Sequence, residues 1–242
     1  MAFRSAQSAR VLMGILSASA YTRNLGGSYD NEMLDVTTLV DTARKFIVGQ
    51  NTSTFTIDGP LDTDPTANAQ FDVLNDQLAG LVNVPVSFGF DGFTLANTGI
   101  WLINALDSQL TYSSTNAGTT DWSLSAQVDG ITDFNGVSLS DIAAVTIDTN
   151  GTTVDGGAAT ANGGVGHLHV TAFSGLTSNS VIVEHSTNDS VWSTLGTFTL
   201  VSGVTSERLV IAAGTTVNRY LRVRDDVTGT GSCTRAAFFA RR

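Results

Sequence analysis

The feature that most constrains the fold of this chain is an alternation of apolar and polar residues with a period of two. It recurs in three segments, at 54–58, 84–91 and 122–129, and each segment leads into an Asp-Gly pair. Side chains of a β-strand point to opposite faces in turn, so this period is typical of a strand with one buried and one wet face. Asp-Gly favours a tight turn after each strand. The pattern predicts a mainly β fold.

One segment has helical spacing instead. Apolar residues recur at intervals of three and four between Asn68, a suitable N-cap, and Gly80, a suitable stop. This spacing predicts one short helix over 69–80. A second, shorter helical turn is predicted near Asp41 to Phe46.

The segment 24–50 is expected to be a long connection. Connections beyond about 12–15 residues are uncommon in compact domains and are usually functional or disordered. This one is too apolar to be disordered, so we expect it to dock against something. Its candidate contact residues are Met33, Leu34, Val36, Leu39, Val40, Phe46 and Ile47.

Composition and charge both change near residue 150. Residues 1–150 carry 16 acidic and 5 basic residues, whereas residues 151–242 carry 6 and 7. A glycine-rich stretch at 150–166 coincides with this change and predicts a domain boundary, with domains at 1–150 and 151–242. Beyond the boundary, closely spaced short strands and no helix are typical of a small antiparallel sandwich. These strands are expected at 165–173, 180–186, 194–201, 206–213, 217–225 and 233–241.

Composition excludes several classes of protein. At 42% hydrophobic and 14% charged the chain is not disordered, and no apolar run approaches the roughly 18 residues of a membrane span. The apolar run 11–16 follows Arg10 and imitates a signal peptide, but it is too short, and an ordinary strand is the favoured interpretation. The single cysteine, Cys233, excludes an internal disulfide. Lys45 is the only lysine, so binding to nucleic-acid phosphates is not expected.

No catalytic or metal-binding motif emerges. His167 and His169 share a strand face, and with His185 as a third ligand they would suggest a metal, but polar residues on a wet face are the favoured interpretation. The segment after Asp62 imitates a calcium loop and lacks its glycine and its final glutamate. No glycine fingerprint for a dinucleotide and no nucleophile elbow is present. We therefore expect no enzyme, no cofactor and no metal.

The polar faces of the predicted strands are unusual, because they are small, neutral or acidic and contain no Lys or Arg. Ordinary solvated faces interleave both signs of charge. Two interpretations stay open: an unremarkable outer face, or a surface that lets a polyanion pass without sticking. The residues concerned are Thr54, Thr56, Asp58, Ser87, Asp91, Ser125, Gln127 and Asp129.

Two stretches of the chain resemble a known family. The run from Leu34 to Gly49 (LDVTTLVDTARKFIVG), followed by Thr54 to Gly59 (TFTIDG), is similar to the core of the major tail tube proteins of long-tailed, siphovirus-type bacteriophages. Residues 163–172, 183–192 and 217–222 are similar to a module appended to many of them. The resemblance covers 10–150 and 155–242. Departures include Val40 and the acidic pair Asp225-Asp226.

The resemblance implies an all-β structural subunit, with a tail-tube β-barrel domain, one short helix and a C-terminal sandwich that is immunoglobulin-like or carbohydrate-binding-like. Such subunits form hexameric rings that stack into a tube. The polar face would then be the lumen for double-stranded DNA, the 24–50 segment the contact between subunits or rings, and the module 151–242 an external decoration. The implied partners are copies of the chain and the tape measure, tail terminator and distal tail proteins. The implied location is the virion tail, assembled in the host cytoplasm.

Two other functions are weighed against this one. The first is a virion surface or decoration protein with a glycan-binding C-terminal module, which has no reason to carry the apolar segment 24–50. The second is a hydrolase, and the missing catalytic constellation argues against it.

Overall fold

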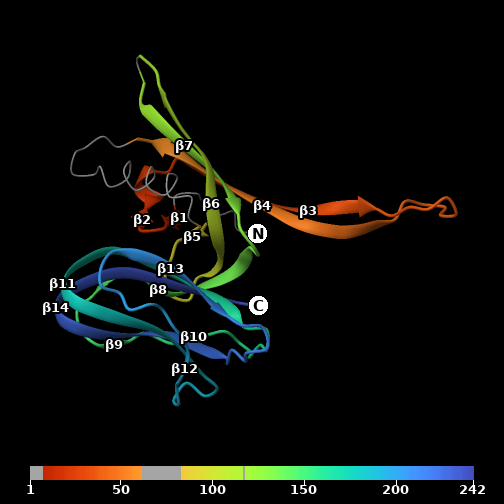
Figure 1. Ribbon diagram of the computed structural model, residues 1–242. Helices are drawn as coiled ribbons and strands as arrows, with labels where there is room; N and C mark the ends of the chain where they lie inside the picture. Colours follow the sequence, from red (N-terminus) through yellow and green to blue (C-terminus); the bar gives the residue numbers. More distant parts are fainter. Residues whose placement is uncertain (1–7, 62–82, 117) are drawn as a thin grey trace.

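The computed structural model describes residues 8–61, 83–116 and 118–242, and these residues are mostly β-strand (Figure 1). The mainly β fold is confirmed. The strands join into one 14-stranded antiparallel sheet that runs through the whole molecule. The helix predicted over 69–80 lies outside the described residues.

The N-terminal body contains the three segments with period-two alternation, and all three are strands. Its elements are β1 (Arg10–Met13), β2 (Leu16–Ser17), the 3-10 helix η2 (Ala18–Tyr21), β3 (Asn24–Asp35), β4 (Phe46–Pro60), β5 (Val84–Gly89), β6 (Thr98–Ser114) and β7 (Thr120–Val128). Phe55 of β4 and Trp122 of β7 are buried together, and the Phe88 ring of β5 lies 5.5 Å from that of Phe55. The apolar faces of the alternating strands therefore form the core of the body.

The expectation of a long connection over 24–50, with a helical turn near Asp41 to Phe46, is wrong. β3 and β4 pair as an antiparallel hairpin with Met33 opposite Val48, and this hairpin extends far from the body (Figure 1). Residues 41–45 form no helix. The spacing of four between Asp41 and Lys45 serves an ion pair within the hairpin tip instead.

The C-terminal part is built on two long strands rather than on six short ones. β11 (Gly164–Ser186) covers the two segments expected at 165–173 and 180–186, and β14 (Tyr220–Arg241) covers the segment expected at 233–241 and all but the first three residues of the one at 217–225. The two strands pair along most of their length, with register shifts near Gly175 and Gly229. Both glycines have φ in the left-handed region, at 75° and 98°, which a strand can adopt at such a bulge only with glycine or strain.

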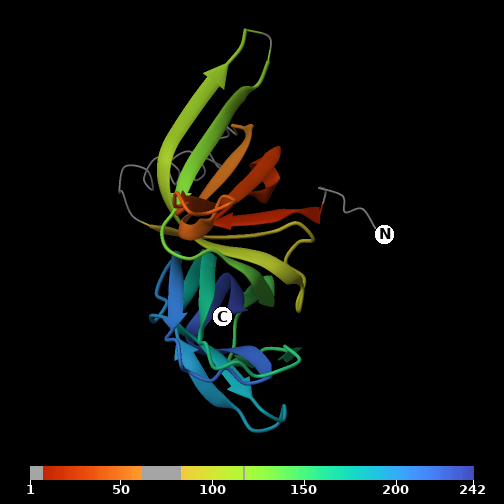
Figure 2. The same cartoon turned by 90° about the vertical axis from the view of Figure 1, so that its right-hand side faces the viewer.

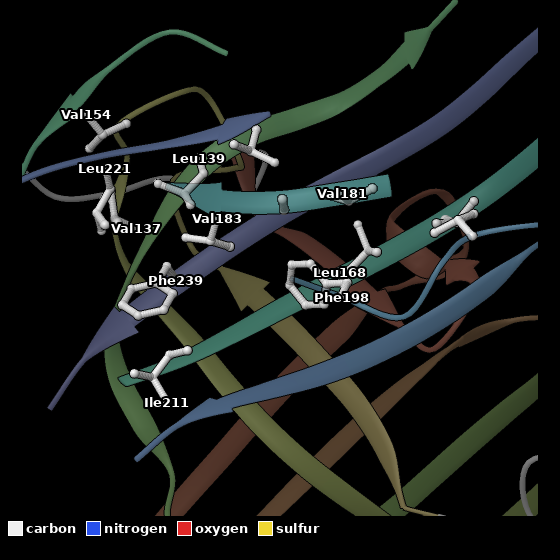
Figure 3. Packing of buried hydrophobic residues seen from close by; sticks show 14 of the residues in the cluster. Val137, Leu139, Val154, Leu168, Val181, Val183, Phe198, Ile211, Leu221 and Phe239 are labelled. Atoms are coloured by element: carbon white, nitrogen blue, oxygen red, sulfur yellow. The ribbon is translucent and has the colours of Figure 1, made fainter. Parts of the chain in front are cut away.

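The bend in these two strands creates the C-terminal core. Leu168 lies on the first half of β11, and Val181 and Val183 lie on the second half, and all three point into one apolar cluster with Phe198 and Phe239 (Figure 3). Short strands extend the sheet around this cluster. They are β9 (Thr149–Asn150), β10 (Val154–Asp155), β12 (Ser193–Thr197) and β13 (Thr205–Ile211).

The strand β8 (Asp133–Val145) connects the two parts. It pairs with β6 of the body and with the second half of β14, and its residues Val137 and Leu139 belong to the C-terminal core. Figure 2 shows the body above and the C-terminal strands below. The boundary after residue 150 stays a prediction, but the sheet crosses that position and β8 lies on its N-terminal side.

Candidate assembly interface

The β3–β4 hairpin exposes apolar side chains on both of its faces. Met33 pairs with Val48 and Leu34 pairs with Ile47, and neighbouring pairs point to opposite sides of the two-stranded ribbon. All four side chains are exposed. The tip is more exposed still, with Leu39 at 106% and Val40 at 89% of full accessibility. The structure therefore brings together, on one projecting hairpin, every contact residue expected from the sequence: Met33, Leu34, Val36, Leu39, Val40, Phe46 and Ile47.

A polar network orders the tip beneath these apolar side chains. The Thr38 backbone N–H and its hydroxyl both donate to Asp41 Oδ2, at 2.8 and 2.9 Å. The Lys45 ammonium pairs with the same carboxylate, and the Lys45 backbone N–H donates to Thr37 Oγ1 at 2.9 Å. At the end of β3, the Thr37 N–H donates to Asp35 Oδ1 at 2.9 Å. Internal hydrogen bonds thus hold the tip in one shape.

The carboxylates of the tip are held in their charged form. Lys45 and the two hydrogen bonds from Thr38 lower the pKa of Asp41, and the hydrogen bonds from Thr37 lower the pKa of Asp35. A carboxyl group whose pKa is lowered in the folded state stabilises that state above its ordinary pKa. This stabilisation is lost as pH falls through the lowered pKa. The network of the tip is therefore intact at neutral pH.

The outer edge of β3 is open. Within the described residues β3 pairs only with β4, and its sequence contains neither Lys nor Pro. Both residues are common devices by which proteins stop an edge strand from pairing with another chain. The acidic side chains Asp30, Glu32 and Asp35 supply the only charges along this edge.

Strand register collects five of the eight predicted lumen residues on one polar face. Thr54 lies opposite Gln127, Thr56 lies opposite Ser125, and Asp58 continues the same side of β4. Neighbouring strands extend this surface, which we call the polar strand face. Its polar residues are Asn24, Ser28, Thr54, Thr56, Asp58, Gln109, Thr111, Ser123, Ser125 and Gln127, and the apolar Leu106 lies opposite Gln127.

Hydrogen bonds between side chains tie this face together. Asn24 Nδ2 donates to Asp58 Oδ1 at 2.8 Å, and the hydroxyls of Ser28 and Thr54 lie 2.7 Å apart. Arg23 directly precedes Asn24 of the polar strand face, and its guanidinium forms an ion pair with Asp121 at 3.3 Å. Sequence reasoning missed this pair, because the two residues are 98 positions apart.

The other three predicted lumen residues lie elsewhere. Ser87 is fully buried and hydrogen-bonded to two histidines, so the prediction that it lies on an open polar face is wrong. β5 is buried on both faces, so Ser87 points toward β11 of the C-terminal part instead of toward solvent. Asp91 lies in the turn after β5, and Asp129 lies after β7, where its carboxylate accepts a hydrogen bond from Asn83.

The histidines differ from the expectation of a wet strand face. His167 and His169 are both fully buried, while His185 is only partly buried and accepts a hydrogen bond from the Asn218 N–H at 3.2 Å. Across the described ranges no group of three or more His, Cys, Asp or Glu side chains is placed to hold a metal ion. The same ranges contain no helix that is long and apolar enough to cross a membrane.

Known proteins offer little similarity to this chain. No family model matches it, and no curated protein matches it. Among solved structures, a chain from the virion of a native gene transfer agent particle is 15% identical, with a TM-score of 0.43 over 55% of this chain and 98% of that one. A chain of the PVC sheath-tube complex, an extracellular contractile injection system, is 17% identical, with a TM-score of 0.42 over 55% and 92%.

A third structure covers nearly the whole chain. The SPP1 Dit protein, described as a hub adsorption apparatus of phages that infect Gram-positive bacteria, is 12% identical, with a TM-score of 0.38 over 96% of this chain and 98% of that one.

Proposed function

We propose that this chain is a structural subunit of a bacteriophage tail. Copies associate into rings, six to a ring as the sequence resemblance implies, and the rings stack into a hollow tube. The observation that carries the proposal is the β3–β4 hairpin, an ordered ribbon that projects from the body with apolar side chains on both faces.

The hairpin needs a partner on energetic grounds. An isolated two-stranded hairpin is at best marginally stable in water, and this one holds large apolar side chains in solvent. Full burial of one such side chain contributes about 1.5–3 kcal/mol. A hairpin that docks on the body of the next copy forms a heterologous contact, which repeats to give a closed ring or an open stack. Self-association would therefore bury the apolar faces of the hairpin and give the open edge of β3 a strand to pair with.

The polar strand face supports the same function. In a ring it would line the channel, where small neutral and acidic side chains offer nothing to hold DNA phosphates. Affinity for DNA comes mainly from Lys and Arg contacts to phosphate, so a channel without free cations lets DNA slide. Arg23, at the rim of this face, is already neutralised by Asp121.

The remaining assignments follow from this arrangement. The C-terminal strands, whose charge is close to balanced, would decorate the outside of the tube. The partners would be the tape measure, tail terminator and distal tail proteins, in a virion tail assembled in the host cytoplasm.

The hairpin tip provides the test. The double substitution Leu39→Ser/Val40→Ser removes the two most exposed apolar side chains and leaves the Thr38–Asp41–Lys45 network in place. We expect purified unmodified chain to form rings or tubes at high concentration, and this variant to stay monomeric while keeping its melting temperature. Sedimentation and negative-stain electron microscopy measure both outcomes.

Ile147→Ser is the matched control, because Ile147 is 70% exposed in the loop between β8 and β9 and lies outside the hairpin. It should assemble as the unmodified chain does. Tubes formed equally well by the tip variant would overturn the role of the hairpin. An unmodified chain that stays monomeric at every concentration, with and without a tail-tip nucleator, would overturn the proposed function itself.

A further inference from the structure

The body and the C-terminal strands meet at a buried seam with a polar centre. Its apolar part joins residues of β1 and β6 to the end of β14, with Phe93 packed against Phe238 at 4.7 Å between ring centroids. Beside this cluster, His167 and His169 of β11 point at Ser87 of β5. All three polar side chains are fully buried.

Hydrogen bonding fixes the protons of this centre. His169 Nδ1 lies 2.7 Å from the Gly14 carbonyl oxygen, which only accepts, so His169 carries its proton on Nδ1. Its Nε2, 2.9 Å from Ser87 Oγ, must then accept the hydroxyl proton. Ser87 Oγ is left to accept from His167 Nδ1 at 3.1 Å. The result is a one-way chain, from His167 through Ser87 and His169 to Gly14, with both imidazoles neutral.

The surroundings oppose any added proton. The Phe238 ring of β14 lies 6.0 Å from His169. The turn after β1 contributes the Gly14 carbonyl and β5 contributes the Ser87 hydroxyl. The charged group that acts on His167 is Arg208 of β13. His167 Nε2 has no hydrogen-bond partner in the described part of the chain. Burial lowers the pKa of His169 to about 4, and burial, His169 and Arg208 hold the pKa of His167 well below its usual range.

We propose that Ser87, His167 and His169 form an acid-sensitive latch that couples the C-terminal strands to the N-terminal body. At neutral pH the ordered chain of hydrogen bonds closes the seam. A proton added to His169 Nε2 turns that atom into a donor, so the Ser87 hydroxyl proton loses its acceptor and stays buried without a partner unless His167 moves its own proton to Nε2 and accepts with Nδ1. A second proton, on His167, leaves the Ser87 hydroxyl proton with no acceptor and places two buried positive charges side by side near Arg208, so the seam opens. The latch works within one chain and needs no partner.

The direction of the pH effect follows from linkage. Both histidines bind protons more weakly in the folded state than at their ordinary pKa of 6.5, so the latch is fully stabilising above that value. Stability is lost as pH falls from 6.5 towards about 4. Each histidine lowers the equilibrium constant for the closed seam by up to about tenfold per pH unit in that window.

Calorimetry of the full chain, at a concentration where sedimentation shows a monomer, tests the coupling. We expect one cooperative unfolding transition at neutral pH that resolves into two at pH near 5, because the body and the C-terminal strands then melt separately. The variant H167N/H169Q cannot titrate there and should show the same profile at both pH values. His185→Gln, which removes the third histidine outside the seam, should keep the behaviour of the unmodified chain.

The proton positions give a test that needs no variant. Nitrogen NMR of histidine-labelled protein at neutral pH should show both His167 and His169 as Nδ1–H tautomers, whereas neutral histidine free in water favours Nε2–H. The latch is excluded if His169 carries its proton on Nε2. It is also excluded if the unfolding profile of the unmodified chain is the same at both pH values, or if H167N/H169Q still splits at low pH.

Discussion

At the residue scale, the most demanding feature is a charged pair enclosed in the C-terminal core. Asp225 is fully buried and Arg235 is 3% exposed, and Arg235 Nε donates to Asp225 Oδ1 at 2.9 Å. Asn179 Nδ2 donates to the same oxygen at 2.8 Å. In the sequence Asp225 is visible only as a departure from the family pattern, because its partner Arg235 lies ten residues further along the chain, beyond the bulge at Gly229.

The first prediction concerns this pair. Asp225→Ala leaves the Arg235 cation buried without its partner, and we expect a loss of about 3–5 kcal/mol in the free energy of unfolding. Replacing both residues by apolar ones, Asp225→Leu/Arg235→Met, should cost much less, because no charge then stays desolvated. Chemical denaturation of the two variants measures the difference. Equal losses in both would show that packing, and not the charge, sets the cost.

The second prediction concerns the polar strand face. Thr56→Lys places a cation on an exposed position there, and it should change folding stability by no more than about 0.5 kcal/mol. If the face lines a channel, virions carrying this change should eject DNA more slowly, with the effect fading as salt rises. Val191→Lys, at an exposed bend between β11 and β12, is the control. Normal ejection in low salt by the Thr56→Lys virion would remove the channel assignment.

At the element scale, the sequence predicted the strands in which apolar and polar residues alternate and missed the outer part of the β3–β4 hairpin, where both faces are exposed. The alternation of Phe55 and Ile57 with threonine is visible because β4 has one inner side there. Further out on the same strand, Phe46-Ile47-Val48 is a continuous apolar run, since both faces of the hairpin are exposed. That run has no period to detect, and it was interpreted as part of a connection.

The burial of His167 and His169 could not be predicted for a related reason. Their i, i+2 spacing correctly places them on one face of β11. Whether that face is wet depends on β5, which lies 80 residues earlier in the chain and contributes Ser87. The sequence predicts β11 and β14 as two strands each, because Gly175 and Gly229 at their bulges are also typical of turns.

The third prediction tests how β4 enters the body. A Cβ on Gly59 would lie 1.8 Å from the Tyr21 carbonyl oxygen, a backbone atom that cannot move aside without shifting η2. Gly59→Ala should therefore destabilise the body, by about 1–3 kcal/mol as for other overpacked sites. Gly203→Ala is the control, since a Cβ there has no neighbour within 4 Å. Thermal melting compares the two, and equal melting temperatures would contradict the close approach.

At the scale of the whole molecule, the C-terminal core crosses the boundary that charge and glycine content predict near residue 150. The C-terminal core takes Val137 and Leu139 from β8, and β8 covers the second half of β14. The change of composition near residue 150 shows that the two parts of the chain differ in surface charge. Charge does not show where a core ends, because that depends on which strands pair.

The fourth prediction follows from this difference. A fragment spanning 133–242 should fold and melt cooperatively, because it keeps β8 with its C-terminal partners. A fragment spanning 151–242 should be less stable or unfolded, since it loses two core side chains and uncovers a long edge of β14. Circular dichroism melts of the two fragments decide between them. Equal stability would restore the boundary near residue 150.

The anchorage of the hairpin has a mechanical consequence. Seven successive residue pairs, from Thr54–Gln127 to Pro60–Asp121, join β4 to β7. Backbone hydrogen bonds in an antiparallel ladder run perpendicular to the strands. A pull on the hairpin along its length therefore loads these bonds in shear, all at once, instead of peeling them one by one. A filament whose neighbouring units grip one another by such hairpins would resist stretching along the hairpin direction and yield more easily to sideways bending.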